Sequence, residues 1–264
     1  MRAWRMVVGA GRDTARAVVM TSYDDRFSYS LYVPRVYSTL AVVVHGTDRD
    51  VLGYRDAFAG FAEENDCMIL APLFPADVPD PDGYKYLCRG QIRYDEILLG
   101  MVDEVAGRYD IATERFLLFG FSGGGHFTHR FLYLHPDRLL AASIGAPGAV
   151  TLLDGARPWP AGIADTADCL GHKIDPAAVA AIAVQLVVGE KDLSTDGIAT
   201  DARHPAWIAG VNDAGVPRPA RLHALRESLE HHGAQVRYDL VPEAAHDAPA
   251  IFPVVQAFFS DILS

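Results

Sequence analysis

One glycine-rich stretch places a serine in a setting suited to nucleophilic chemistry. Residues 120–124 read Gly-Phe-Ser-Gly-Gly, a match to the pattern G-x-S-x-G around Ser122. The apolar run 116–119 precedes this stretch, and a helix-compatible segment, 127–135, follows it. A serine on a sharp strand-to-helix turn needs small residues two positions away on each side, because the strand and the helix pass too close for a Cβ atom. The motif predicts a serine nucleophile, and the alternative is a glycine-rich connection without catalytic role.

Two more chemically active side chains follow later predicted strands. Asp192 comes after the aliphatic run 180–188, and His246 comes after the run 236–241. A serine hydroxyl is a weak nucleophile at neutral pH and needs a base. An imidazole can take its proton and later return it, and a carboxylate can hold the imidazole in the required tautomer. Other carboxylates compete with Asp192 for that last role, namely Glu190, Asp196 and Asp201.

Metal and nucleotide sites have no comparable pattern. The ten histidines include no H-E-x-x-H motif, and His126 and His129, three apart on a predicted helix, have no third ligand nearby. We expect both to be core residues or to lie behind the site, and we expect His45 to be structural. Neither a phosphate-binding P-loop nor a dinucleotide fingerprint is present, so we expect neither a metal nor a cofactor.

Composition narrows the class of partner. The net charge of −11 over 264 residues disfavours nucleic acid and anionic membranes, because the long-range field repels polyanions. No apolar run reaches the ~20 residues of a membrane span, and the first residues do not read as a secretory leader. Three scattered cysteines are expected to be free thiols, so we predict a cytoplasmic protein with a small-molecule substrate. A homodimer is left open.

Strands and helices alternate along the whole chain, which predicts an α/β fold: a mostly parallel sheet with helices on both faces. We expect one domain, 1–264, with loop insertions at about 74–93, 147–178 and 193–217 over the active site. The expected strands are 4–9, 27–34, 40–44, 67–73, 116–119, 139–144, 180–188 and 236–241, and the expected helices are 54–65, 94–109, 127–135, 218–232 and 249–263.

The order serine, aspartate, histidine at successive strand ends, together with His45-Gly46 after an earlier strand, resembles the α/β-hydrolase superfamily. The resemblance covers essentially the whole chain. The glycine-rich elbow is most similar to small esterases of the dienelactone-hydrolase-like and polyhydroxybutyrate-depolymerase-like branches. The first of these typically carries a cysteine nucleophile, and this chain has serine. The resemblance implies a triad of Ser122, His246 and Asp192, with backbone N–H groups of Thr47 and Gly123 as the oxyanion hole.

The predicted reaction is hydrolysis of a carboxylic ester through an acyl-enzyme, and a lactone, thioester or amide would use the same groups. Arg49 or Arg89 could meet a substrate carboxylate. The predicted substrate-binding residues are Tyr84, Tyr86, Arg89, Phe121, Trp159 and Trp207. Two alternatives stay open: a C–C hydrolase or lyase on the same fold, and a low-turnover small-molecule-binding protein that retains the triad.

Overall fold

The computed structural model describes residues 7–8, 18–204 and 207–264. The strand expected at 4–9 therefore lies mostly outside the described residues. Its described part, β1 (Val7–Val8), pairs antiparallel with β4 (Val36–Tyr37).

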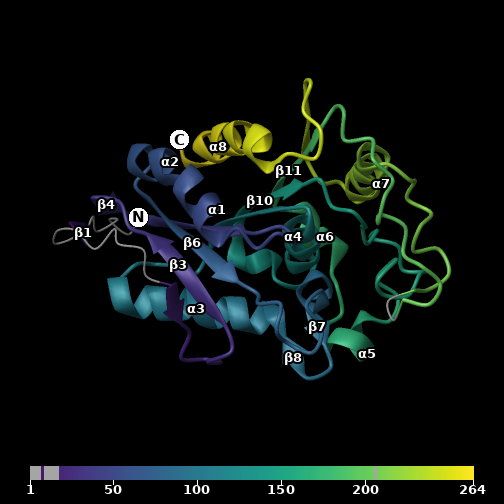
Figure 1. Cartoon of the computed structure of the whole chain (residues 1–264), viewed down its shortest axis with the longest axis horizontal. Coiled ribbons are helices and arrows are strands. Elements are labelled where there is room, and N and C mark those ends of the chain that lie inside the picture. Colours follow the sequence, from purple (N-terminus) through teal and green to yellow (C-terminus); the bar gives the residue numbers. More distant parts are fainter. Residues whose placement is uncertain (1–6, 9–17, 205–206) are drawn as a thin grey trace.

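The main sheet has eight strands and confirms the predicted fold class (Figure 1). Their spatial order is β12 (Val236–Val241), β11 (Ala183–Gly189), β10 (Leu139–Gly145), β9 (Phe116–Phe121), β5 (Thr39–Val44), β6 (Cys67–Leu73), β3 (Ser28–Tyr32) and β2 (Val18–Met20). The six strands from β12 to β6 are parallel, and β3 and β2 continue the sheet antiparallel. The short exposed edge strand β2 was not expected, since it carries no buried pattern.

Aliphatic strands form the centre because helices cover them on both faces. On β9, Phe116 contacts Phe131 of α4 (Gly123–Leu134). Three residues later, Phe119 contacts Phe58 and also Phe252 of α8 (Ala248–Leu263). Because successive side chains of a strand point to opposite faces, these contacts place α4 and α8 on opposite sides of the sheet. Figure 1 shows α8 together with α1 and α2 along one side and α3 along the other.

The structure corrects two predicted helices and one predicted strand. The helix expected at 54–65 is two helices, α1 (Val51–Ala57) and α2 (Ala59–Glu64), and α1 begins early because the Asp50 side chain accepts the Gly53 N–H. Helix α4 begins directly after Ser122, and its glycines, which are poor helix formers, concealed this start. The strand expected from 180 begins at Ala183, because α6 (Pro176–Ala180) occupies the preceding residues. Helices α3 (Tyr94–Tyr109) and α7 (Arg218–His231) lie close to their expected ranges.

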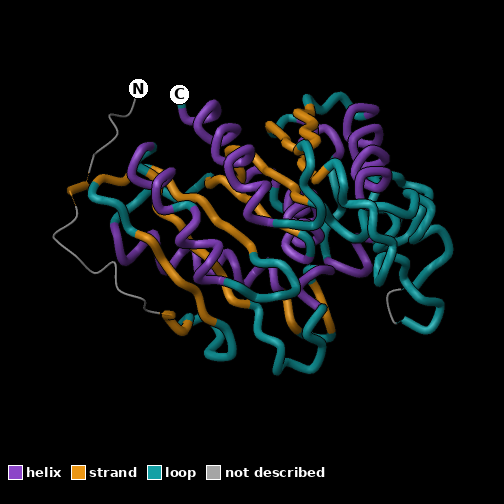
Figure 2. The backbone as a smooth tube through the Cα atoms, turned by 45° about the horizontal axis from the view of Figure 1, so that its top comes forward, coloured by secondary structure: helices purple, strands orange, loops and turns teal. Residues whose placement is uncertain are grey.

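The three segments expected as insertions, 74–93, 147–178 and 193–217, consist mainly of loops and turns. Figure 2 draws the loops of the chain as teal tube. The first contains a 3-10 turn (Gly83–Tyr86) and the hairpin β7 (Cys88–Arg89) and β8 (Ile92–Arg93). The second contains α5 (Thr166–Leu170), and the third shows neither helix nor strand in its described part. The three cysteines are free, and none of the helices in the described ranges is long and apolar enough to cross a membrane.

Candidate active site

Ser122 lies in a strained turn between β9 and α4. Its backbone has φ 54° and ψ −112°, a conformation that non-glycine residues rarely adopt. The turn is held because Ser122 N–H donates to Gly145 O at 2.8 Å. A Cβ atom on Gly120 would lie 2.2 Å from Gly124 O, and one on Gly124 would lie 2.2 Å from Val44 O. Both flanking glycines are therefore required by the close approach of backbone to backbone.

His246 bridges Ser122 and Asp192. Its Nε2 lies 3.0 Å from Ser122 Oγ, and its Nδ1 lies 2.7 Å from Asp192 Oδ2. A carboxylate only accepts, so Nδ1 carries the proton and Nε2 is left to accept the serine O–H. The ring also stacks on Phe121 with centroids 4.7 Å apart. The structure thus brings together the three residues that the motif order singled out.

The loops that carry Asp192 and His246 are tied to each other by backbone contacts. Lys191 N–H donates to Ala244 O at 2.8 Å, and Glu190 N–H donates to Val241 O at 2.9 Å. A Cβ atom on Gly189 would lie 2.3 Å from Ala245 O, so the two loops pack against each other directly. Both ring nitrogens of His246 are occupied by Asp192 and Ser122. The competing carboxylates, Glu190, Asp196 and Asp201, therefore do not bind His246 in this arrangement.

Arg218 is a site residue that the sequence analysis missed. Its Nη1 donates to Asp192 Oδ1 at 2.9 Å, while the other carboxylate oxygen accepts from His246. The Asp192 side chain is fully buried, and that of Arg218 is 13% exposed. One signal was available: a cation in the first turn of α7 opposes the helix dipole, so its position calls for another partner.

The expected oxyanion donors lie on ordered backbone. Gly123 is the first residue of α4, so its N–H has no partner within the helix. The loop of Thr47 is anchored by His45, which accepts the Phe74 N–H at Nε2 (3.0 Å) and donates from Nδ1 to Gly46 O. Burial lowers the pKa of His45 to about 4, so the ring is neutral and structural, as expected.

Arg49 also holds this loop. It donates to Thr47 O at 2.8 Å and to Phe74 O at 2.9 Å, so its donors serve backbone carbonyls in this structure.

A cavity of about 320 Å³ opens beside Ser122, and each of the three loop insertions contributes to its wall. Among the predicted site residues, Thr47, Gly123 and Tyr86 line it. Tyr84 is fully buried and stacks on Phe74 with ring centroids 5.4 Å apart. A Cβ atom on Gly123 would lie 2.0 Å from Tyr84 Oη, so the phenol packs directly against the residue after Ser122. Residues that no prediction assigned to the wall are Asp82, Lys85, His126, Gly148, Ala149, Gly197, Ile198, Ala199, Thr200, Asp201, His204 and Arg218.

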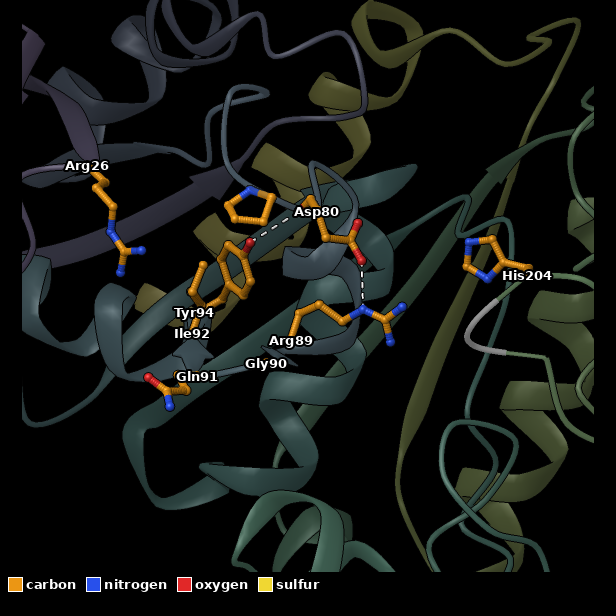
Figure 3. Close-up of a pocket in the computed structure, with 9 residues that line it drawn as sticks. Arg26, Asp80, Arg89, Gly90, Gln91, Ile92, Tyr94 and His204 are labelled. Atoms are coloured by element: carbon orange, nitrogen blue, oxygen red, sulfur yellow. Dashed lines mark hydrogen bonds and ion pairs between the residues drawn. The ribbon is translucent and has the colours of Figure 1, made fainter.

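Three predicted substrate-binding residues lie elsewhere in the described part of the chain. Arg89 lines a second, larger cavity of about 690 Å³, where it pairs with Asp80 at 2.7 Å (Figure 3). His204 lies on the wall of both cavities. The Arg130 guanidinium packs on the Trp159 side chain, with Arg130 Cζ 5.4 Å from the centroid of the indole ring. Trp207 is 44% exposed. Aromatic side chains in loops can pack against the body or meet a ligand, and the sequence alone does not separate the two.

Buried histidines connect α4 to the second insertion. Ala149 N–H donates to His126 Nε2 at 3.1 Å, and Thr151 N–H donates to His129 Nε2 at 3.0 Å. Burial holds the pKa of both rings well below the usual range, so both are neutral. Across the described ranges, no three His, Cys, Asp or Glu side chains gather as a metal site would need.

No protein-family model and no curated protein matches this chain. Solved structures do match, and their structural similarity to this chain shows a shared α/β-hydrolase fold. Poly(aspartic acid) hydrolase-1 from Sphingomonas sp. KT-1 is 22% identical with a TM-score of 0.72, over 88% of this chain and 92% of that one. The poly(3-hydroxybutyrate) depolymerase LpqC from Bordetella parapertussis is 23% identical with a TM-score of 0.73, over 89% and 84%. An S-formylglutathione hydrolase from Agrobacterium tumefaciens is 14% identical with a TM-score of 0.60, over 90% and 89%.

Proposed function

We propose that this protein is a serine hydrolase that cleaves a carboxylic ester through an acyl-enzyme. The observation that carries the proposal is the continuous chain of contacts from Asp192 through His246 to Ser122 Oγ, at 2.7 and 3.0 Å. The serine in this chain is also held in a strained turn beside a cavity, an arrangement that packing alone does not require.

In the first half of the reaction, Ser122 Oγ attacks the ester carbonyl carbon while His246 Nε2 takes the hydroxyl proton. Asp192 holds the ring in the correct tautomer and stabilises the imidazolium that forms. The backbone N–H groups of Gly123 and Thr47 would stabilise the oxyanion, and one such donor is typically worth about 3 kcal/mol in the transition state. Collapse of the intermediate passes the proton from His246 to the departing alkoxide oxygen and leaves an acylated serine.

In the second half, a water molecule replaces the alcohol. His246 takes a proton from water, the hydroxide attacks the acyl carbon, and the returning proton releases Ser122. The same groups could open a lactone or cleave a thioester or an amide, since all pass through a tetrahedral oxyanion. The names of three structural neighbours support hydrolytic chemistry: hydrolases of poly(aspartic acid) and of S-formylglutathione, and a depolymerase of poly(3-hydroxybutyrate).

Fluorophosphonate labelling tests the proposal directly. The probe should modify Ser122, as mapped by peptide mass spectrometry, and labelling should abolish turnover of p-nitrophenyl acetate and butyrate. Ser122→Ala should lose both labelling and turnover with the fold intact, whereas Ser194→Ala, which changes an exposed serine in the third insertion, should keep both. An active Ser122→Ala enzyme would rule out this mechanism.

Labelling without turnover of any simple ester would instead favour the C–C hydrolase or lyase alternative, and a folded protein that resists labelling would favour the binding protein. A cytoplasmic location and the lack of a nucleic-acid partner remain predictions from composition.

A further inference from the structure

The cavity beside Ser122 has cationic side chains on its wall, although the protein as a whole is acidic. Lys85 and Arg218 both line it. The Lys85 side chain lies close to the reacting centre, because a Cβ atom on Gly123 would be 3.2 Å from Lys85 Cε. Lys85 Nζ pairs with Asp82 at 2.8 Å, and the Asp82 side chain is 44% exposed. Arg218 shares its partner, Asp192, with His246.

Two more guanidinium groups lie behind this wall. Arg130 is fully buried, donates to Thr151 Oγ1 and to the backbone O of Lys85, and packs over the Tyr86 ring. Arg221 is also buried and donates to neutral acceptors, among them Gly148 O at 2.6 Å. Within the described residues neither has a carboxylate within ion-pairing distance. Removing a charge from water is costly when no opposite charge lies nearby, so two buried guanidinium groups without a carboxylate partner are unusual in a protein core.

The balance of charge around the cavity is therefore positive. Four cationic groups surround it: Lys85, Arg130, Arg218 and Arg221. Two carboxylates are paired with them, Asp82 and Asp192. A third carboxylate on the wall, Asp201, pairs with the exposed Arg203 at 3.1 Å. Burial lowers the pKa of Arg130 to about 10, which still leaves that group charged at neutral pH.

Two N–H donors at the same wall have no hydrogen-bond partner among the residues that the structure describes. His126 Nε2 accepts the Ala149 N–H, so the proton of this neutral ring lies on Nδ1, which is buried and makes no hydrogen bond. Arg218 Nε is likewise buried and unbonded. Buried polar groups are nearly always paired, and each exception calls for an explanation. An acceptor supplied by a ligand, with a small adjustment of the wall to admit it, accounts for both.

We propose that this cavity binds a carboxylate carried by the ester substrate, with Lys85 and Arg218 supplying charge and Arg218 Nε–H and His126 Nδ1–H supplying further donors. This inference rests on the proposed hydrolase function and narrows its substrate to esters with an anionic group on the acyl or the alcohol side. A volume of about 320 Å³ is at the small end of ligand pockets, which suits one short acid unit rather than a large ring system.

Matched esters that differ only by carboxylate or carboxamide test the proposal. Monomethyl adipate and methyl adipamate place the group on the acyl side, and acetoxyacetate and acetoxyacetamide place it on the alcohol side. Hydrolysis is followed by pH-stat. In at least one pair, kcat/KM should be about tenfold or more higher for the carboxylate ester than for the carboxamide ester, because one charged hydrogen bond is worth about that factor. A carboxamide ester hydrolysed as fast as its carboxylate partner in both pairs would overturn the inference and leave the hydrolase standing.

Two variants locate the site through the same ratio. Lys85→Gln removes one charge, and His126→Gln keeps an acceptor for the Ala149 N–H but loses the Nδ1 donor. Each variant should lower the ratio of kcat/KM for the carboxylate ester to kcat/KM for the carboxamide ester by about threefold or more, because each removes part of the free energy of a charged hydrogen bond. Lys173→Gln is the matched control, because Lys173 is exposed and does not line the cavity, and the ratio should stay unchanged. An unchanged ratio in Lys85→Gln with the fold intact would refute the assignment.

Binding of the free acid separates this inference from the proposed function. By calorimetry, adipate should bind the wild-type protein about tenfold more tightly than adipamide, and Lys85→Gln should weaken that preference. If no ester is hydrolysed but adipate binds in this Lys85-dependent way, the hydrolase proposal fails and the anion site stands. Equal binding of adipate and adipamide would exclude the anion site whatever the turnover.

Discussion

Replacing Arg218 with glutamine tests how far the triad depends on the ion pair behind it. The change removes the donor to Asp192 Oδ1, which lies 2.9 Å from Arg218 Nη1, and leaves the bond from Asp192 Oδ2 to His246. The two side chains are 13% and 0% exposed, so water does not simply replace the lost contact. A hydrogen bond between charged groups is worth about 1.5–3 kcal/mol. If that energy holds Asp192 in register in the transition state, kcat/KM should fall by roughly 10- to 100-fold.

The assay is steady-state hydrolysis of p-nitrophenyl butyrate, with thermal unfolding of each variant as a check on the fold. Arg218→Lys should lose less than Arg218→Gln, because an ammonium keeps the charge but not the planar fork of donors. Arg226→Gln is the matched control: Arg226 is on the same helix and pairs with Glu230 at 2.8 Å, both side chains being more than a third exposed. Its activity should stay within about twofold of wild type, as expected for an exposed ion pair.

Two results would refute this reasoning. An Arg218→Gln enzyme within about threefold of wild-type kcat/KM would mean that the arginine adds less to the transition state than one hydrogen bond. A well-folded Arg218→Gln protein as inactive as Ser122→Ala would mean that Arg218 does more than position Asp192.

Three further predictions follow from the same contacts. Asp192→Asn should lower kcat by about 10⁴-fold, less than Ser122→Ala, because the amide favours the wrong histidine tautomer; a rate equal to wild type would exclude Asp192 as the acid. Gly124→Ala should destabilise the fold by about 3 kcal/mol, because its Cβ would lie 2.2 Å from Val44 O, while Gly107→Ala, with open space in α3, should be neutral or stabilising in a melting experiment. His45, with its pKa lowered from 6.5 to about 4, stays neutral when folded, so its stabilising contribution is complete above pH 6.5 and declines as the pH falls toward 4. At pH 5 this loss is about 2 kcal/mol, and urea unfolding of His45→Gln at pH 7 and pH 5 should show a pH dependence smaller by that amount.

The sequence predicted best the strands and helices whose pattern of apolar residues reflects burial alone. The strands Cys67–Leu73 and Val236–Val241 occupy their predicted residues, and so does α3. The order of Ser122, Asp192 and His246 was also visible, because each lies in the turn or loop that follows a strand, and parallel strands end at one edge of the sheet. Element starts were less visible where a cap or a glycine-rich first turn decided them, as at Asp50 and Gly123.

The cationic wall could not be predicted, because it exists only after folding. Lys85, His126 and Arg218 come from three separate segments and have no common motif, and their meaning depends on which donors remain unpaired once the chain is compact. The net charge of −11 would by itself suggest a protein that repels anions. That charge acts through solvent, where physiological salt screens it within ~8 Å, whereas the groups in the cavity act at contact distance with little water between. An acidic surface is thus compatible with a site that binds a small carboxylate, and the same surface still disfavours an extended polyanion such as nucleic acid, whose charges lie outside the cavity.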